Sequence, residues 1–143
     1  MKSILFALSI LMTGAAGSTI TGSDMEAISK AVTAFATHAD NQDVPKMATV
    51  LHKDFRAVVN RLFGSEEVAL MDKSLYLDLL KQGKIGGAKR TVRIHSIDIE
   101  ENNAIVRATF QGEQMTFNTF IQLVKDVQGH WTIIGDMPRI EQR

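Results

Sequence analysis

The sequence predicts one α+β domain, in which helices pack on the concave side of a strongly curled, mostly antiparallel sheet. Two observations predict this fold. Helix-start residues and apolar spacings of three and four residues dominate the first half of the chain, and four β-branched runs separated by short polar turns fill the second half. Helices followed by an antiparallel meander are typical of the α+β class. The 143 residues suit one domain, and no repeat or linker indicates another.

The first seventeen residues predict a secretory signal peptide. Lys2 gives a positive start, Ile4–Met12 is a nine-residue apolar run, and Ala15–Ser18 supplies small residues for a peptidase. The run is shorter than the roughly 20 apolar residues that cross a bilayer. An N-terminal core helix is the alternative, but two glycines interrupt it. We therefore expect a signal peptide over 1–17, a domain over 18–143, and a periplasmic or secreted mature protein free of the membrane.

Composition excludes several classes of function. Acidic and basic side chains balance at 16 each, so no charge excess indicates nucleic acid as a partner. The chain has no cysteine, which excludes disulfides, thiolate metal sites and a cysteine nucleophile. The four histidines lie in separate elements without H-x-H or H-E-x-x-H spacing, so we expect no metal site. Nothing in the sequence indicates a cofactor.

Three helices are predicted before residue 84. Ser23–Glu26 fits the S-x-x-E capping box of a first helix. The apolar face of that helix consists of Ile28, Val32, Phe35 and Ala36. Asp43 is placed to cap a short second helix, and Asp72 to cap a third that Gly83 ends.

Two strands are predicted between the second and third helices. Phe55–Phe63 is rich in β-branched and aromatic residues, Gly64–Glu67 reads as a turn, and Val68–Met71 is a short returning strand. A continuous helix over Ser65–Gln82 is the competing interpretation.

A glycine-rich basic loop, Lys84–Arg90, leads to four further strands. These are Thr91–Glu100, Ala104–Gln111, Gln114–Lys125 and His130–Met137. Val92 and Ile94 have one parity, whereas Ile97 and Ile99 have the other, which predicts a β-bulge near His95-Ser96. The diglycine of the loop could bind an anion through backbone N–H groups, or form a solvated turn.

The order of several short motifs resembles the nuclear-transport-factor-2-like superfamily, and within it most closely the bacterial group of putative lumazine-binding proteins. The motifs are Leu51–Phe55, Gly83–Arg90, Ile97–Ile99 with Asn102–Ala104, Phe117–Lys125 and Gly129–Ile134. The resemblance spans about Glu26 to Met137. It implies a cone-shaped, cystatin-like α+β barrel whose sheet wraps around three N-terminal helices, and a homodimer formed through the sheet face.

The same superfamily includes ketosteroid isomerases and polyketide cyclases, so the resemblance raises the question of catalysis. The tyrosine donor of an isomerase falls on Phe35, its aspartate base on Val59, and its aspartic-acid donor on Thr119. A register error of one residue would place Asn60 and Asn118 there, which supply no base. We expect no isomerase activity and assign no catalytic residue.

A pocket inside the cone is the predicted site for a small apolar or aromatic molecule. We expect its lining to comprise Phe35, Val59, Tyr76, His95, Phe117, Thr119 and Asp136. His95 is included because a bulge can redirect a side chain into a cavity. Asp136 is either a pocket acid with a raised pKa or a strand-end residue that reaches solvent. Packing as core is the alternative for the remaining residues.

Three classes of function remain. The first is a non-catalytic small-molecule-binding protein, favoured by the cavity-forming fold. The second is an interaction module, since Phe120 and Val124 have the opposite parity to Ile121 and Leu123 and indicate a second apolar sheet face. The third is an enzyme with unfamiliar residues in the same pocket, such as Asp136 with His95 or Tyr76.

Overall fold

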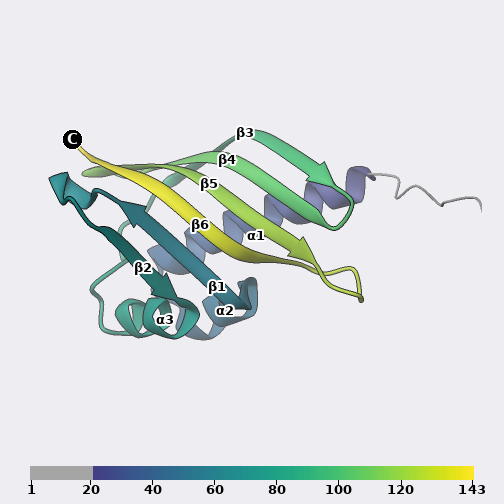
Figure 1. The fold of residues 1–143 in the computed structure, drawn as a ribbon, viewed down its shortest axis with the longest axis horizontal. Coiled ribbons are helices and arrows are strands. Elements are labelled where there is room, and N and C mark those ends of the chain that lie inside the picture. The colour runs from purple at the N-terminus through teal and green to yellow at the C-terminus, as the bar shows by residue number, and fades with distance from the viewer. Residues whose placement is uncertain (1–20) are drawn as a thin grey trace, which may run out of the picture.

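The computed structural model describes residues 21–143 and shows three α-helices and a six-stranded sheet (Figure 1). The helices are α1 (Gly22–Asp40), α2 (Val44–Val50) and α3 (Lys73–Lys81), with a 3-10 turn η1 (Leu62–Gly64). The strands are β1 (Leu51–Asn60), β2 (Val68–Asp72), β3 (Thr91–Glu100), β4 (Asn103–Gln111), β5 (Met115–Lys125) and β6 (Trp131–Gln142). The predicted α+β class is confirmed. The predicted signal peptide lies outside the described residues.

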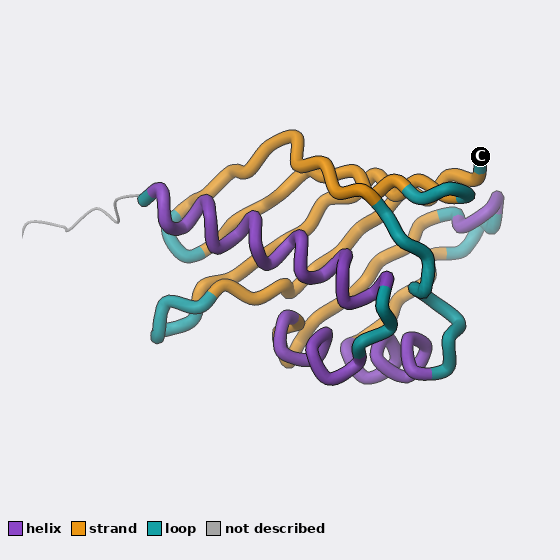
Figure 2. The backbone as a smooth tube through the Cα atoms, turned by 180° about the vertical axis from the view of Figure 1, so that it is seen from behind, coloured by secondary structure: helices purple, strands orange, loops and turns teal. Residues whose placement is uncertain are grey.

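The sheet has the order β2-β1-β6-β5-β4-β3, in which only the β1–β6 pair is parallel. The three helices lie on one face of the sheet, and α1 crosses it diagonally when the molecule is seen from behind (Figure 2). We call this face the inner face and the opposite one the outer face. Among residues 21–143 no helix covers the outer face. In the same part of the chain, no helix has the length and apolar character to cross a membrane.

Aromatic side chains from both layers meet in the core. Phe35 of α1 lies 6.0 Å from Tyr76 of α3 and 6.2 Å from Phe110 of β4, measured between ring centroids. Phe55 of β1 meets Tyr76 edge-on at 5.4 Å. Phe55 and Phe110 are almost completely buried, so this cluster joins the helices to the inner face.

The bulge predicted in β3 is present. Ile94 pairs with Ala108 and Ser96 pairs with Arg107, which leaves His95 as the extra residue. Because one residue is inserted, Ile94 and Ile97 both pack against the core despite their opposite parity.

The first helix begins differently from the prediction. Thr21 is the N-cap and makes no side-chain capping bond, so the predicted S-x-x-E capping box does not form. Glu26 instead pairs with Lys30 one turn later. Asp24 accepts a hydrogen bond of 2.9 Å from Trp131 Nε1 and lies 3.3 Å from Lys125 Nζ. The first turn of α1 therefore holds the β5–β6 hairpin rather than capping itself.

The predicted caps of the other two helices are confirmed. Asp43 accepts from the backbone N–H of Lys46 at 3.1 Å, and Asp72 accepts from that of Leu75 at 2.9 Å. The alternative of one continuous helix is wrong, because β2 occupies 68–72. β1 begins at Leu51, four residues earlier than predicted, because Leu51 pairs with Ile133 of β6.

Candidate functional site

The inner face is closed along most of its length and opens at one end of the sheet. Along β5 the inward-facing side chains change from Ile121, with 0% exposure, and Thr119, with 2%, to a half-buried Phe117 and to Met115, with 37%. Ile140, which pairs with Phe117 across β5 and β6, is also half-buried. We call this region the open end.

Arg90 lies at the open end and is fixed by Asp40, the last residue of α1. Arg90 Nε donates to Asp40 Oδ1 at 2.6 Å, and the Arg90 backbone N–H donates to Asp40 Oδ2 at 2.9 Å. Both side chains are only 10% exposed. The guanidinium also lies over the rings of Phe110 and Phe117, at 5.2 and 4.9 Å from their centroids. The Arg90 guanidinium, paired with Asp40, is thus held beside the rings of Phe110 and Phe117.

A second bulge, which the sequence analysis did not predict, places Asp136 on the inner face. Leu123 pairs with Ile133, but the preceding residue Gln122 pairs with Gly135, so Ile134 is inserted into β6. A Cβ atom on Gly135 would lie 2.4 Å from Gln122 Oε1 and 3.3 Å from Gln122 Cβ, so a larger residue here would displace the Gln122 side chain. After the bulge Asp136 points inward and is 8% exposed.

Asp136 and Thr119 form the polar centre of the site. Thr119 Oγ1 donates to Asp136 Oδ1 at 2.5 Å, and both residues are buried. Burial raises the pKa of the Asp136 carboxyl to about 6, although the Thr119 hydrogen bond and the charge of Arg90 oppose the rise. The carboxyl therefore changes charge near neutral pH, unlike an exposed aspartate.

Tyr76 adds a neutral phenol to the site. Burial raises the pKa of the phenol above its ordinary value, and the nearby Asp136 charge raises it further. Within residues 21–143, no fully buried side-chain nitrogen or oxygen lacks a hydrogen-bond partner. Tyr76 and Asp136 are 9% and 8% exposed, and neither Tyr76 Oη nor Asp136 Oδ2 makes a hydrogen bond to another residue among 21–143. Both oxygens therefore keep unused hydrogen-bonding capacity.

Five of the seven predicted site residues are buried, namely Phe35, Val59, Tyr76, Thr119 and Asp136, and Phe117 is half-buried at the open end. Phe35 and Tyr76 belong to the main apolar core and Phe117 packs against it, whereas Val59 lies outside that core. The reading of Asp136 as a strand-end residue that reaches solvent is wrong, because the residue is only 8% exposed.

The seventh residue, His95, is placed wrongly by the prediction. His95 is the extra residue of the β3 bulge and is exposed on the outer face, where its Nε2 lies 2.8 Å from Thr109 Oγ1. The bulge thus turns His95 toward solvent instead of toward the core.

The basic loop before β3 packs against the end of α1. The backbone N–H of Gly87 donates to Ala39 O at 3.0 Å, and Gln42 Nε2 donates to Ile85 O at 3.1 Å. The Gly87 N–H, one of the groups that could have bound an anion, is therefore used to end α1. In the part of the chain described, no cluster of three or more His, Asp or Glu side chains could hold a metal ion.

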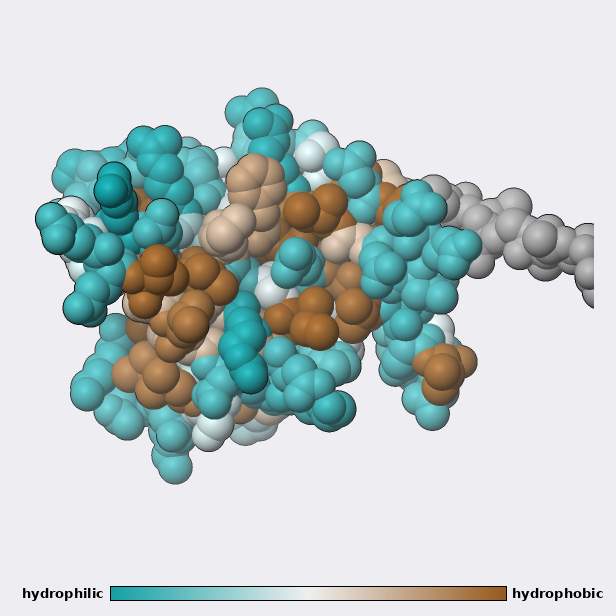
Figure 3. Space-filling view, in the orientation of Figure 1, coloured by the Kyte–Doolittle hydropathy of each residue, from teal (hydrophilic) through white to brown (hydrophobic). Residues whose placement is uncertain are grey.

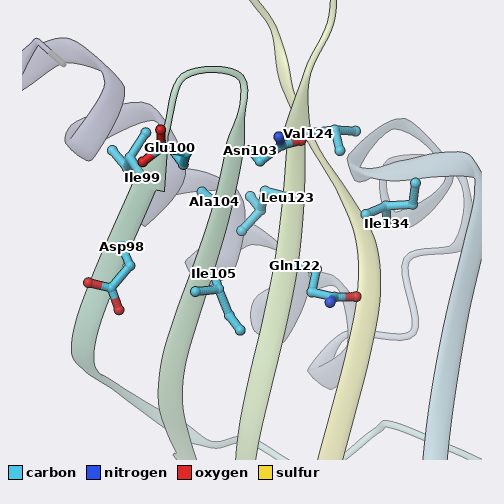
Figure 4. Close-up of a pocket in the computed structure, with 10 residues that line it drawn as sticks. All are labelled: Asp98, Ile99, Glu100, Asn103, Ala104, Ile105, Gln122, Leu123, Val124 and Ile134. Atoms are coloured by element: carbon cyan, nitrogen blue, oxygen red, sulfur yellow. The ribbon is translucent and has the colours of Figure 1, made fainter. Parts of the chain in front are cut away.

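The outer face carries two adjoining grooves and a broad apolar surface. The first groove has a volume of about 610 Å³, and Asp98 and Glu100 lie at its β3 side (Figure 4). The second groove includes Arg56 and shares Ile105, Gln122 and Ile134 with the first. Apolar residues gather over much of this face (Figure 3). The most exposed large apolar side chains on β2, β4, β5 and β6 are Leu70 (64%), Val68 (52%), Met137 (51%), Phe120 (46%) and Ile105 (40%).

Comparisons with known proteins agree with this architecture. A family model described as "Putative lumazine-binding" matches residues 23–137. A comparison with curated proteins gave no match.

Several solved structures share the fold. An NTF2-like protein of unknown function from Silicibacter pomeroyi is 15% identical, with a TM-score of 0.73 over 86% of this chain and 100% of that chain. An NTF2-like protein of unknown function from Shewanella baltica is 16% identical, with a TM-score of 0.74, and the match covers 86% of this chain and 98% of that chain. A ketosteroid isomerase-like protein from Erwinia carotovora is 14% identical, with a TM-score of 0.65, and the match covers 85% of this chain and 98% of that chain. Identities this low establish the fold alone.

Proposed function

Because the chain belongs to the family described as "Putative lumazine-binding", we propose that it binds a small, flat, partly apolar molecule on the inner face, between the open end and Asp136, and does not convert it. The observation that carries this proposal is a pair of oxygens, Tyr76 Oη and Asp136 Oδ2, that make no hydrogen bond to the residues of 21–143, in a core where the Tyr76 ring stacks on Phe35. Ligand sites are typically apolar with a few polar groups that fix orientation. Lumazine, a flat bicyclic dione, has this character.

The absence of conversion is supported by the positions that match isomerase catalytic groups. Phe35, Val59 and Thr119 are buried on the inner side, where an isomerase would need a base and acidic donors. None of these three side chains can supply a base.

We expect Phe117→Ala to weaken the binding of lumazine at least tenfold, since it removes an aromatic surface from the open end. The titration would follow the fluorescence of lumazine at constant protein concentration. Phe117 is half-buried, so the variant should lose less stability than the 3–5 kcal/mol typical of a fully buried phenylalanine.

Phe120→Ala is the matched control for that experiment. Phe120 lies on the same strand, but it is 46% exposed on the outer face. Its replacement should leave the affinity for lumazine unchanged. Equal losses of affinity in the two variants would refute a site at the open end.

We also propose that the outer face joins two copies of the chain. Five large apolar side chains on this face are between 40% and 64% exposed, and such a patch commonly marks an interface. A second copy of the chain, related to the first by a twofold axis, would cover these side chains.

Phe120→Asp should convert this dimer into a monomer, because it places a charge at the centre of the apolar surface. Light scattering coupled to size-exclusion chromatography measures the change in mass. A wild-type protein that is monomeric at all concentrations tested would exclude the dimer.

Export of the protein is proposed from the sequence of residues 1–17 alone. The mature chain should then begin close to Ser18. N-terminal sequencing of the native protein tests this, and an intact Met1 would contradict it.

A further inference from the structure

Resting on the function proposed above, we propose that Asp136 selects the ligand by pairing its carboxyl group with a ring lactam, the adjacent N–H and C=O groups of a heteroaromatic molecule. Lumazine contains such lactams. The inference therefore names the part of the ligand that is recognised and the residue that recognises it.

The hydrogen bonds of Asp136 leave one edge of its carboxyl group free to pair with a lactam. Oδ1 accepts from Thr119 Oγ1 and retains a second lone pair, and Oδ2 has no partner within residues 21–143. A neutral carboxyl group thus offers one acceptor and one O–H donor side by side. A lactam offers the complementary donor and acceptor, so the two groups form a pair of parallel hydrogen bonds. Thr119 holds the carboxyl in position by donating to Oδ1.

The surroundings of Asp136 favour this neutral form. Its cross-strand neighbours, Ala57 on β1 and Ile121 on β5, are apolar and buried. Within residues 21–143, the charge of Arg90 favours the ionised carboxylate of Asp136, but Arg90 is itself paired with Asp40 of α1. The Tyr76 phenol of α3, whose pKa the Asp136 charge raises, is uncharged at neutral pH. Burial outweighs the effect of Arg90 and favours the neutral carboxyl group.

Binding should consequently weaken as the pH rises. With a pKa of about 6, the neutral fraction of Asp136 falls from about nine-tenths at pH 5 to about one-tenth at pH 7. The dissociation constant for lumazine should then rise about tenfold over this interval. A bound lactam stabilises the neutral carboxyl and raises its pKa, so the rise in the dissociation constant follows the pKa of the free protein.

The experiment is a set of fluorescence titrations with full-length mature protein at pH 5, 6 and 7. Lumazine is one probe, and 1,3-dimethyllumazine, whose ring nitrogens carry methyl groups in place of hydrogen, is the other. Wild type should bind the dimethyl probe at least tenfold more weakly than lumazine at pH 5. This comparison needs no variant and so does not depend on how well a variant folds.

Two variants separate the neutral acid from the carboxylate. Asp136→Asn keeps one donor and one acceptor, so it should bind lumazine within about threefold of wild type at pH 5 and with no dependence on pH. Asp136→Ala should bind at least tenfold more weakly at every pH. Thermal unfolding of both variants checks that they are folded.

The outcomes distinguish this inference from the proposed function. Wild type that binds lumazine equally well at pH 5 and pH 7, or an Asn variant as weak as the Ala variant, overturns the lactam pairing but leaves a binding site. Equal affinity for the two probes also overturns it. Failure of wild type to bind lumazine even at pH 5 overturns both proposals.

Discussion

Asp40→Ala is expected to lower the free energy of unfolding by about 3–5 kcal/mol, because it leaves a buried arginine without its partner. Asp40 and Arg90 are each only 10% exposed and are joined through two hydrogen bonds to the carboxylate. Without the carboxylate, the guanidinium must remain unpaired between Phe110 and Phe117 or move out to solvent. Urea-induced unfolding at pH 7 measures the change.

Glu26→Ala is the control, since it removes an ion pair of the same kind from the surface. Glu26 and Lys30 are 67% and 76% exposed, and such pairs contribute only about 0.3–0.5 kcal/mol. The double variant Asp40→Leu with Arg90→Met should recover much of the lost stability, because it leaves no charge to be buried. If Asp40→Ala costs no more than Glu26→Ala, the ion pair does not stabilise the fold.

The elements that sequence reasoning predicted well are those set by near neighbours. Asp43 and Asp72 cap their helices because each carboxylate reaches an N–H group three residues ahead. The bulge at His95 was predictable because the parity of four apolar residues changes there. The family resemblance was also read correctly from the order of short motifs.

The predictions that failed depend on residues distant in sequence. Ser23 and Glu26 satisfy the pattern of a capping box, but Asp24 between them binds Trp131, 107 residues away. His95 was expected in the core because sequence locates a bulge without giving the direction in which the extra side chain points. The structure shows that it points outward.

In the candidate site, too, some positions follow from near neighbours in sequence and others depend on distant residues. Phe35, Tyr76 and Thr119 were assigned to the interior from helical spacing, strand parity and the resemblance, and each is buried. The sequence does not decide whether Asp136 is buried or reaches solvent, because a bulge at Ile134 determines the face of the sheet on which Asp136 lies. Glycine within a strand pattern often marks a bulge, so Gly135 was the available signal.

The ion pair of Arg90 with Asp40 was not predicted at all. These residues are 50 positions apart, and no spacing rule connects the end of a helix with a loop before a strand. The basic loop was noticed, but as a possible anion site, whereas its arginine is neutralised by a carboxylate within the chain.

Gly86→Ala is expected to lower the free energy of unfolding by about 2–5 kcal/mol, through two separate effects. Gly86 has φ +72°, a conformation that costs an L-residue about 1–2 kcal/mol. An added Cβ would also lie 2.2 Å from Ala39 O and 2.8 Å from Leu80 Cδ1, and crowding of this kind adds about 1–3 kcal/mol. Relief of the contact would move the loop away from the end of α1.

Gly129→Ala separates the two effects, because Gly129 has φ +89° but nothing within 4 Å of an added Cβ. Gly129→Ala should lower the free energy of unfolding by only about 1–2 kcal/mol, the effect of the positive φ alone, in the same urea titration. The additional loss of stability in Gly86→Ala then measures how tightly the loop packs on α1. Because Arg90 follows four residues later in that loop, Gly86→Ala should also weaken lumazine binding, whereas Gly129→Ala should not. Equal stability losses in the two variants would show that the loop yields freely, and the site would then not depend on its close fit to Ala39.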